Sequence, residues 1–261
     1  MALPPILADK HPEALSVFEP SALLREARRQ KRVAAAEVPP VCILDPDGDI
    51  VSHLKNSGAA KRVSDWPCYH TDLYSFALAN RTCGIIGSAV GAPFAVLVAE
   101  ELFASGCRLL ISVTSAGQIL PAASLPYFLV IDRALRDEGT SYHYAAPEAF
   151  AVADPQLVDA AIRALNASGL PAHVGPSWTS DAPFRETAEA IAAARARGLL
   201  AVEMEAAALY TFARKRNMAV LCLAQITNTM GLAVQDFEKG EAQGADQALT
   251  MLEVLAGSLL K

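Results

Sequence analysis

Two glutamates, Glu203 and Glu205, lie where a short apolar run ends and a helix is predicted to begin. The first turn of a helix carries unpaired N–H groups and partial positive charge, so carboxylates there stay ionised even when they are half buried. An ionised carboxylate only accepts hydrogen bonds, which makes two adjacent sugar hydroxyls a natural partner, and Met204 offers the sugar a soft apolar surface. Residue type alone favours a plainer interpretation, in which both glutamates only complement the helix dipole.

Five segments give the chain a resemblance to one known family. Residues 202–210, Val-Glu-Met-Glu-Ala-Ala-Ala-Leu-Tyr, are similar to the signature helix of the nucleoside phosphorylase and nucleosidase superfamily. Residues 115–121 resemble the Ser/Thr-x-Gly-x-x-x-Pro turn of these enzymes, and residues 87–93 resemble their Gly-x-Gly-x-Gly-x-Pro segment. Residues 137–144 and 179–181 are similar to segments of uridine phosphorylase, in the same order and at similar spacing.

The resemblance, which covers about residues 40–260, implies an enzyme that cleaves the N-glycosidic bond of a nucleoside. This reaction builds positive charge on the anomeric carbon of the ribose while the base leaves with negative charge. By resemblance, Glu205 would bind the ribose hydroxyls and Met204 would line the face of the sugar. Thr114 and Ser115, with the backbone amide of Gly117, would hold the attacking phosphate or water.

Recognition of the base is expected in residues 178–186. Phe184 could stack on the base, Arg185 offers a fork of donors to a base carbonyl, and Asp181 lies in the same segment. A structural alternative is that Asp181 and Thr179 cap a helix that begins near Phe184. Arg185 fits a ligand contact and a surface ion pair equally well.

Asn228 ends the last predicted strand, where purine-cleaving members of the superfamily carry an aspartate that protonates the purine. An amide can donate a hydrogen bond but cannot give up a proton. Asn228 therefore favours a pyrimidine, or another base that leaves without full protonation, and the Val-Asn segment of uridine phosphorylase is similar. The structural alternative is an asparagine that ends a strand in a turn.

The resemblance fails at the positions where phosphorylases bind phosphate. These enzymes use a glycine and an arginine in the first strand–helix turn, a second arginine before the Ser/Thr turn, and a third lent by the neighbouring subunit. The corresponding residues here are Pro46 and Ile50, then Ser112, then His70. Each charge-assisted contact is worth ~1.5 to 3 kcal/mol, so phosphate binding is expected to be weaker by roughly 10³-fold or more.

Three hypotheses follow for the function. The favoured one is phosphorolysis of a pyrimidine nucleoside to the free base and ribose 1-phosphate, with replacement cations such as Arg28, Arg29 or Arg62. The second is hydrolysis, in which an acid of the Asp-Pro-Asp-Gly-Asp turn at residues 45–49 activates water. The third is a nucleoside-binding protein without catalysis. The acidic turn is also compatible with a purely geometric role.

The composition limits which cellular compartment and which classes of binding partner are expected for this protein. A net charge of −6 argues against a nucleic-acid backbone as the main partner, which leaves small molecules. Five scattered cysteines without a Cys-x-x-Cys pair suggest reduced thiols, and no segment has the apolar length of a signal peptide or of a ~20-residue membrane span. We therefore expect a cytoplasmic protein with no membrane contact. Neither a metal site nor a Gly-x-Ser-x-Gly nucleophile is predicted, and no cofactor is expected apart from phosphate as a co-substrate.

The order of predicted elements indicates an α/β fold. Buried strands are expected at residues 41–44, 83–86, 109–113, 128–131 and 220–226, and helices at residues 93–105, 155–167, 185–197, 205–215 and 245–259. The resemblance implies a single-domain, three-layer sandwich with a mixed, partly barrel-like central sheet over residues 40–261, and a homo-oligomer, either a dimer or a hexamer. Residues 1–39 are expected to form an N-terminal extension whose basic helix runs from Pro20 to about Ala36.

Overall fold

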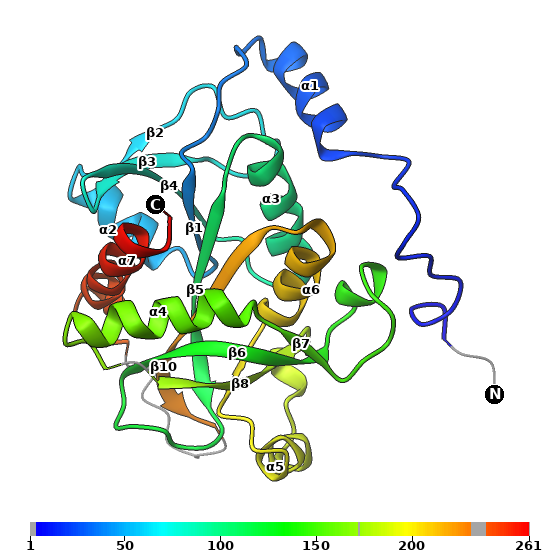
Figure 1. Ribbon diagram of the computed structural model, residues 1–261, viewed down its shortest axis with the longest axis vertical. Helices are drawn as coiled ribbons and strands as arrows, with labels where there is room; N and C mark the ends of the chain where they lie inside the picture. The colour runs from blue at the N-terminus through cyan, green and yellow to red at the C-terminus, as the bar shows by residue number, and fades with distance from the viewer. Residues whose placement is uncertain (1–3, 172, 231–238, 261) are drawn as a thin grey trace.

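The computed structural model describes residues 4–171, 173–230 and 239–260 (Figure 1). Its centre is a ten-stranded sheet flanked by helices. The strands are β1 (Val41–Asp45), β2 (Lys61–Arg62), β3 (Tyr74–Leu78), β4 (Arg81–Gly87), β5 (Leu109–Gln118), β6 (Tyr127–Asp137), β7 (Phe150–Val152), β8 (His173–Ser180), β9 (Ala201–Glu203) and β10 (Ala219–Thr229). The α-helices of the described residues are α1 (Pro20–Lys31), α2 (Asp49–Asn56), α3 (Ala92–Ala104), α4 (Pro155–Ala167), α5 (Ala188–Ala196), α6 (Ala206–Arg216) and α7 (Ala245–Leu259). Short 3-10 segments are η1 (Ser141–His143), η2 (Pro183–Arg185) and η3 (Glu241–Gly244).

The sheet combines a closed ring with an open extension. Its strand order is β10-β6-β8-β9-β5-β1-β4-β3-β2, and β10 also pairs with β5, so that five strands close into a ring. Strands β1, β4, β3 and β2 continue the sheet beyond β5. Parallel pairings join β1 to β4 and β5, β5 to β10, β6 to β8 and β8 to β9, and the other pairings are antiparallel. The predicted mixed, partly barrel-like sheet is confirmed.

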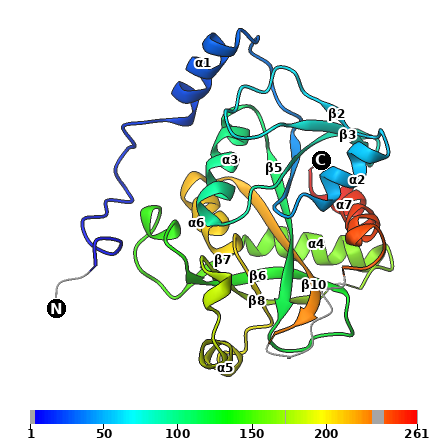
Figure 2. The same cartoon turned by 180° about the vertical axis from the view of Figure 1, so that it is seen from behind.

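The parallel strands at the centre are buried because helices cover both faces of the sheet. All five residues of β1 are buried, and so are nine of the ten residues of β5. Figures 1 and 2 show α3 and α6 on one side of β5, and α2 and α7 on the other. The predicted three-layer arrangement is therefore confirmed. The carboxyl end of β1, where α/β sheets usually bind ligands, lies beside Ser112 of β5, just before Thr114 and Ser115.

Helix α6 begins later than predicted. It starts at Ala206, Glu205 occupies the N-cap position, and Glu203 is the last residue of β9. The prediction that both glutamates lie on the first turn is therefore wrong. The reason is that the Glu203 carboxylate accepts hydrogen bonds from the N–H groups of Glu205 and Ala206. These bonds fix the start of the helix at Ala206.

The predicted turn at residues 115–121 is also wrong in part, because β5 continues through Gln118. Gly117 and Gln118 pair with β9 on one side and with β10 on the other, so the backbone of this segment is held extended. The pairing with β10 shifts by one residue between Ile226 and Asn228, which is a β-bulge. The bulge lies at the end of the sheet where the predicted site residues gather.

Two helices are shorter than predicted. The basic helix α1 ends at Lys31 instead of continuing to about Ala36, because Arg32 adopts a left-handed conformation with φ of 56°. The helix predicted from Arg185 to Arg197 is α5, which spans only Ala188–Ala196. Its N-cap is Thr187, whose hydroxyl accepts a hydrogen bond from the N–H of Ala190.

The segment before α1 runs outside the body of the protein (Figure 1). Three of its large apolar side chains are exposed: Leu15 at 93%, Val17 at 105% and Phe18 at 65%. The five cysteines, in contrast, are all buried and free. Among the described residues no helix has the length and apolar character needed to cross a membrane.

Candidate active site

Glu203 is a structural brace at the start of α6. Its Oε2 accepts hydrogen bonds from the N–H groups of Glu205 and Ala206, both at 2.7 Å. Its Oε1 accepts from the hydroxyls of Ser177 at 2.9 Å and Thr179 at 2.5 Å. Burial raises the pKa of Glu203, and the four donated hydrogen bonds oppose that effect. Glu203 therefore joins β8, β9 and α6, and its acceptor positions are taken by the protein itself.

Glu205 has a different environment although it is only two residues away. It is 2% exposed, and its Oε1 accepts a hydrogen bond from the backbone N–H of Gly91 at 2.7 Å. Its Oε2 is buried without a hydrogen-bond partner among the described residues. Burial, followed by the charge of Glu203, raises the pKa of Glu205 to about 8, whereas the Gly91 N–H and the Thr114 hydroxyl favour the ionised form. Glu205 therefore has one anchored oxygen and one buried oxygen without a partner among the described residues.

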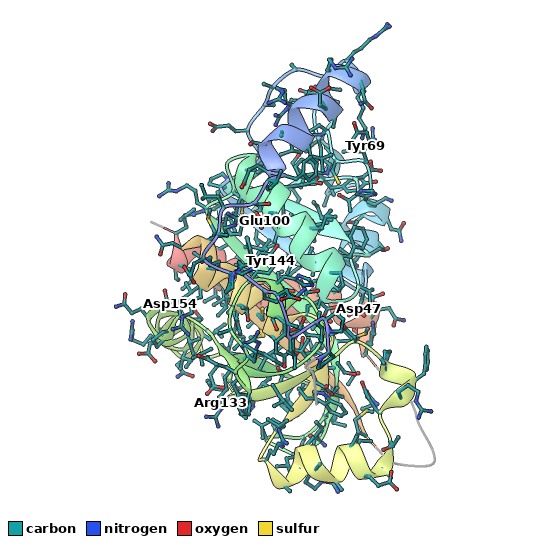
Figure 3. The ribbon with its side chains drawn as sticks, turned by 90° about the vertical axis from the view of Figure 1, so that its right-hand side faces the viewer. Asp47, Tyr69, Glu100, Arg133, Tyr144 and Asp154 are labelled. Atoms are coloured by element: carbon teal, nitrogen blue, oxygen red, sulfur yellow. The ribbon has the colours of Figure 1, made fainter. Side chains whose placement is uncertain are left out.

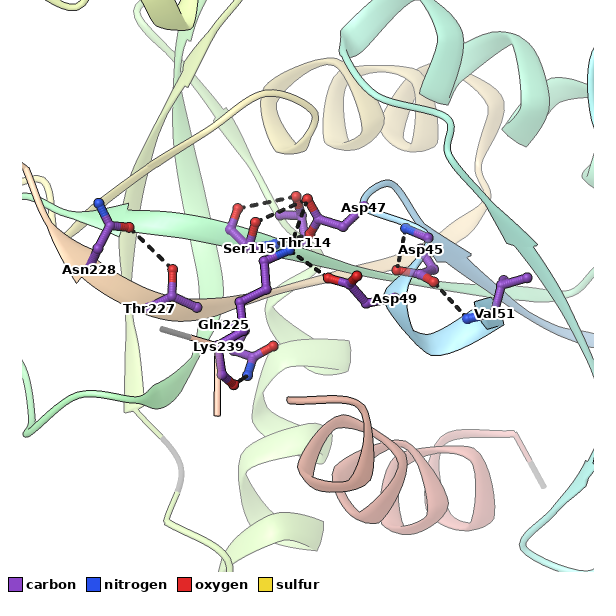
Figure 4. Close-up of polar contacts among 11 residues, drawn as sticks. Asp45, Asp47, Asp49, Val51, Thr114, Ser115, Gln225, Thr227, Asn228 and Lys239 are labelled. Atoms are coloured by element: carbon purple, nitrogen blue, oxygen red, sulfur yellow. Dashed lines mark hydrogen bonds and ion pairs between the residues drawn. The ribbon is translucent and has the colours of Figure 1, made fainter. Parts of the chain in front are cut away.

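Thr114, Ser115 and the backbone amide of Gly117, which were predicted to hold the attacking phosphate or water and are here called the cradle, contact a carboxylate of the chain itself at Ser115. The backbone N–H of Ser115 donates to Oδ2 of Asp47 at 2.6 Å, and the Ser115 hydroxyl donates to Oδ1 at 3.0 Å (Figure 4). The adjacent Thr114 hydroxyl donates to the Ser115 carbonyl at 3.3 Å. Asp47 is close enough to Glu205 for its charge to raise the pKa of that residue. The groups expected to hold a phosphate or a water therefore hold an aspartate.

The three aspartates of the acidic turn have three different environments. Asp45 is buried and accepts hydrogen bonds from the N–H groups of Gly48 at 3.1 Å and Val51 at 2.9 Å, so it caps α2. Burial raises the pKa of Asp45 to about 7. Asp47 contacts Ser115, and Asp49 begins α2 and forms an ion pair with Lys239. The structure therefore gives Asp45 a structural role and leaves Asp47 facing the cradle.

Lys239 was not singled out by the sequence. Its Nζ lies 2.6 Å from Oδ2 of Asp49 and 3.7 Å from Oδ1 of Asp47, and its side chain is 12% exposed (Figure 4). Its carbonyl oxygen accepts a hydrogen bond from Nε2 of Gln225 at 3.1 Å. Lys239 and Asp49 are 190 residues apart, so no local spacing could have indicated this pair.

Asn228 and Gly117 lie opposite each other on β10 and β5, immediately after the bulge. Asn228 is buried, and its Oδ1 accepts a hydrogen bond from the Thr227 hydroxyl at 3.2 Å. A Cβ atom added at Gly117 would lie 2.3 Å from the sulfur of Met230, so a larger residue there would displace the Met230 side chain. The structure thus brings Thr114, Ser115, Gly117 and Asn228 to one end of two paired strands.

The residues predicted to bind the base are on the surface. Phe184 is 98% exposed, and Arg185, beside it in η2, is also exposed. Asp181 accepts a hydrogen bond from the N–H of Gly139 at 2.8 Å, which joins two of the segments that carried the resemblance. The alternative that Asp181 and Thr179 cap a helix is wrong for the helix that follows, since Thr187 caps α5.

A cavity of about 800 Å³ lies between the N-terminal segment and helices α3 and α6. Asp181 lines this cavity, but Glu205 does not. On its wall, the Tyr144 hydroxyl donates to Oε1 of Glu100 at 3.1 Å (Figure 3). The cavity is therefore distinct from the site around Asp47, Ser115 and Glu205.

A family profile described as "Phosphorylase superfamily" matches residues 40–256. The chain belongs to the phosphorylase superfamily. It is 28% identical over 193 residues to a uridine phosphorylase of Thermococcus kodakarensis, covering 66% of each chain. It is 26% identical over 162 residues to a guanosine phosphorylase of Halorubrum lacusprofundi, covering 62% of this chain and 64% of the relative, so the alignments span just under two thirds of these relatives.

The fold is also that of a solved nucleosidase. A Campylobacter jejuni 5'-methylthioadenosine/S-adenosyl homocysteine nucleosidase superposes with a TM-score of 0.69 at 14% sequence identity, covering 84% of this chain and 99% of that chain. The comparisons therefore relate this chain to phosphorylases by sequence and to a nucleosidase by fold. The identity of the attacking nucleophile has to be argued from the site.

The arginines suggested as replacements for those of a phosphorylase have other neighbours. Arg29 pairs with Glu26 at 2.9 Å, and Arg62 pairs with Asp72 at 2.8 Å. Arg28 is on α1, which lies far from the carboxyl end of β5 in both ribbon views (Figures 1 and 2). All arginines of the chain fall within the described residues, and the cation that pairs with Asp47 there is Lys239.

Proposed function

We propose that this protein cleaves the N-glycosidic bond of a nucleoside and uses water as the acceptor. The observation that carries the choice of water is the contact between Asp47 and Ser115, in which a carboxylate accepts from both the N–H and the hydroxyl of the cradle. A phosphate would have to displace Asp47 and then lie beside Asp49 and Glu205. Phosphate and carboxylates repel each other, whereas a water molecule is attracted to a carboxylate that can accept its proton.

In this mechanism Glu205 holds the sugar. Its Oε2, which has no partner among the described residues, would accept hydrogen bonds from the two ribose hydroxyls. Met204 would line the sugar face. An anionic Glu205 also stabilises the positive charge that develops on the ribose as the glycosidic bond breaks. Because hydroxyl donors favour the ionised carboxylate, nucleoside binding is expected to lower the pKa of Glu205 from about 8.

Asp47 acts as the general base. The water oxygen forms a bond to the anomeric carbon, its proton passes to Asp47, and the electron pair of the glycosidic bond leaves with the base, which takes a proton from solvent. A carboxylate has about four lone-pair positions, so Asp47 can accept from a water while it remains bonded to Ser115. Thr114, Ser115 and the backbone at Gly117 would then position the water and Asp47 together.

A pyrimidine nucleoside is the proposed substrate. Asn228 can donate a hydrogen bond to a leaving base but cannot protonate it, which suits a base that leaves as an anion or through its carbonyl oxygens. Phe184, Arg185 and Asp181 are proposed to contact the base. The exposure of Phe184 and Arg185 requires that η2 move over the base, or that a second subunit cover it, when substrate binds.

We also propose that the protein is a cytoplasmic homo-oligomer, either a dimer or a hexamer. Its free cysteines suit a reducing compartment. The exposed Leu15, Val17 and Phe18 form an apolar strip that a monomer would leave in water. A subunit contact through this strip would bury it.

Phosphorolysis is the second candidate, because Lys239 provides one cation beside the cradle. The test incubates the purified protein with uridine and a panel of other nucleosides, with and without inorganic phosphate, in water enriched in oxygen-18. Free ribose that carries the heavy isotope, formed at the same rate without phosphate, supports hydrolysis. Ribose 1-phosphate formed only with phosphate would overturn it in favour of phosphorolysis, and binding without turnover would support a nucleoside-binding protein.

A further inference from the structure

We propose that Lys239 is a positioning residue that holds the Asp47 carboxylate in the Ser115 cradle. The proposal rests on the function proposed above for Asp47. Lys239 touches neither the sugar-binding Glu205 nor the cradle itself in the described contacts, and it pairs with the two acids of the turn. It would therefore act on the reaction through Asp47.

The geometry around Asp47 supports this role. Oδ1 of Asp47 accepts from the Ser115 hydroxyl at 3.0 Å and lies 3.7 Å from Nζ of Lys239, while Oδ2 accepts from the Ser115 N–H at 2.6 Å. Asp47 is thus contacted both by Ser115 and by the ammonium group of Lys239 (Figure 4). The side chain of Lys239 is 12% exposed, so its charge is less screened by water than in a surface pair.

The backbone of Lys239 is fixed to the same pair of strands that carries the cradle. Gln225 donates from Nε2 to the Lys239 carbonyl at 3.1 Å, and Gln225 on β10 lies opposite Ser115 on β5. Gly244 leaves the space that Gln225 needs, since a Cβ atom there would lie 1.8 Å from Nε2 of Gln225. Ser115 and Gln225 therefore set the distance between the cradle and the lysine.

The charges near Asp47 explain why a cation is needed. Asp45 and Asp49 flank it on its own turn, and Glu205 faces it from the start of α6. Like charges favour an Asp47 side chain that turns out to solvent, away from Ser115. Lys239 is the cation paired with Asp47 and Asp49 in the described part of the chain, and its removal should release Asp47 from the cradle.

The test uses the full-length protein and the hydrolysis of the best nucleoside substrate. We expect Lys239→Met to lower kcat by roughly 10-fold to 100-fold, since a small misplacement of a reacting group has a cost of that size. KM for the nucleoside should stay within about 2-fold, because Glu205 is anchored separately by Gly91. Lys239→Arg should restore most of kcat. Arg62→Met, which removes an exposed ion pair with Asp72, is the matched control and should leave both constants unchanged.

A double-mutant cycle shows whether Lys239 acts through Asp47. In an Asp47→Asn background, whose residual rate is measured by chromatography of the free base, Lys239→Met should cause no further loss. Independent, multiplicative losses would overturn the proposal, and so would an unchanged kcat in Lys239→Met. A specific rise in KM for phosphate would also overturn it, by showing that Lys239 binds phosphate.

Failure of the proposed function can be distinguished from failure of the proposal for Lys239. If Asp47→Asn hydrolyses nucleosides as fast as the natural protein, Asp47 is not the base, whatever the Lys239 variants do. Thermal melts accompany each variant. If Lys239→Met does not fold, Lys239→Gln, which keeps a polar group at this position, replaces it in the double-mutant cycle. No further loss in the Asp47→Asn background would support the proposal, and independent losses would overturn it.

Discussion

The backbone N–H of Gly91 donates a hydrogen bond to Oε1 of Glu205 at 2.7 Å, which joins the start of α3 to the start of α6. Both groups lie at helix N-termini, where unpaired N–H groups favour a carboxylate. The contact orients the carboxylate so that Oε2 is left without a partner among the described residues. One interaction between residues 114 positions apart therefore anchors Oε1 of Glu205 and leaves Oε2 as the oxygen proposed to bind the sugar.

The pH dependence of catalysis should report the ionisation of Glu205. If the anion binds the ribose, kcat/KM should increase with pH until Glu205 ionises, at about pH 8 in the free enzyme. The corresponding limb of kcat should lie at lower pH, because bound hydroxyls favour the anion. Initial rates between pH 5 and pH 10 measure both limbs. Glu205→Gln should lose about 10²-fold to 10⁴-fold in kcat/KM, and retained activity would remove Glu205 from the site.

The same carboxyl should make the protein less stable as pH rises. Glu205 ionises near pH 4.5 in the unfolded chain and at about 8 in the folded protein, so the folded state binds the extra proton between these values. The natural protein should therefore lose ~1.4 kcal/mol of unfolding free energy per pH unit across this window relative to Glu205→Gln. Urea titrations of both proteins at pH 5, 7 and 8.5 measure the difference. A difference that does not change with pH would contradict the buried position of Glu205.

Glu203→Gln, unlike Glu205→Gln, should destabilise the protein. The Glu203 carboxylate accepts four hydrogen bonds, and an amide would direct its own N–H groups at two of the donors. We expect a loss of ~2 to 4 kcal/mol in unfolding free energy at pH 7. Denaturant unfolding of Glu203→Gln beside Glu205→Gln gives the comparison. Equal stabilities would mean that the two glutamates do not differ in the way described.

The aspartates of the acidic turn should differ in their contribution to the rate of hydrolysis. Asp47→Asn should lower the rate of hydrolysis by about 10²-fold or more while KM for the nucleoside stays nearly constant. Asp49→Asn is the matched control, since it lies in the same turn and contacts Lys239 but not Ser115. Steady-state kinetics with both variants measure the difference. A larger loss in Asp49→Asn than in Asp47→Asn would transfer the role of base to Asp49.

The N-terminal segment should contribute to subunit assembly. Replacing Leu15, Val17 and Phe18 by serine removes the exposed apolar strip, and each such side chain is worth ~1.5 to 3 kcal/mol when it is buried. We expect the triple variant to dissociate at protein concentrations where the natural chain remains associated. Sedimentation velocity over a range of concentrations measures this change. Identical sedimentation of the two proteins would show that the segment does not hold subunits together.

Most of the sheet could be predicted because its central strands are continuous apolar runs. The runs at residues 41–44, 109–113 and 220–226 all lie in buried parallel strands, and helix α4 has the predicted bounds. Strand β8 could not be recognised in this way, because His173, Gly175 and Pro176 interrupt any apolar or alternating pattern. Strand β8 is stabilised instead by its pairing with β6 and β9.

Some residues of the candidate site could be proposed from the sequence, but the contacts between them could not. Motif similarity identified Thr114, Ser115 and Glu205 without indicating that Asp47 would bind Ser115. The different positions of Glu203 and Glu205 depend on partners from distant strands and loops, namely Ser177 and Gly91. Tertiary contacts of this kind leave no local periodicity, which is why Lys239 gave no signal.

The bulge between Ile226 and Asn228 has a consequence for how the superfamily can diversify. Upstream of it, β10 is committed to the ladder with β5, and a slip of one residue there would exchange interior and exterior side chains along the whole strand. The bulge absorbs one extra residue locally, so insertions, deletions and substitutions near Thr227 can re-aim Asn228 without disturbing the ladder. Selection for a new leaving group could therefore act on this strand tip while the rest of the scaffold is inherited unchanged.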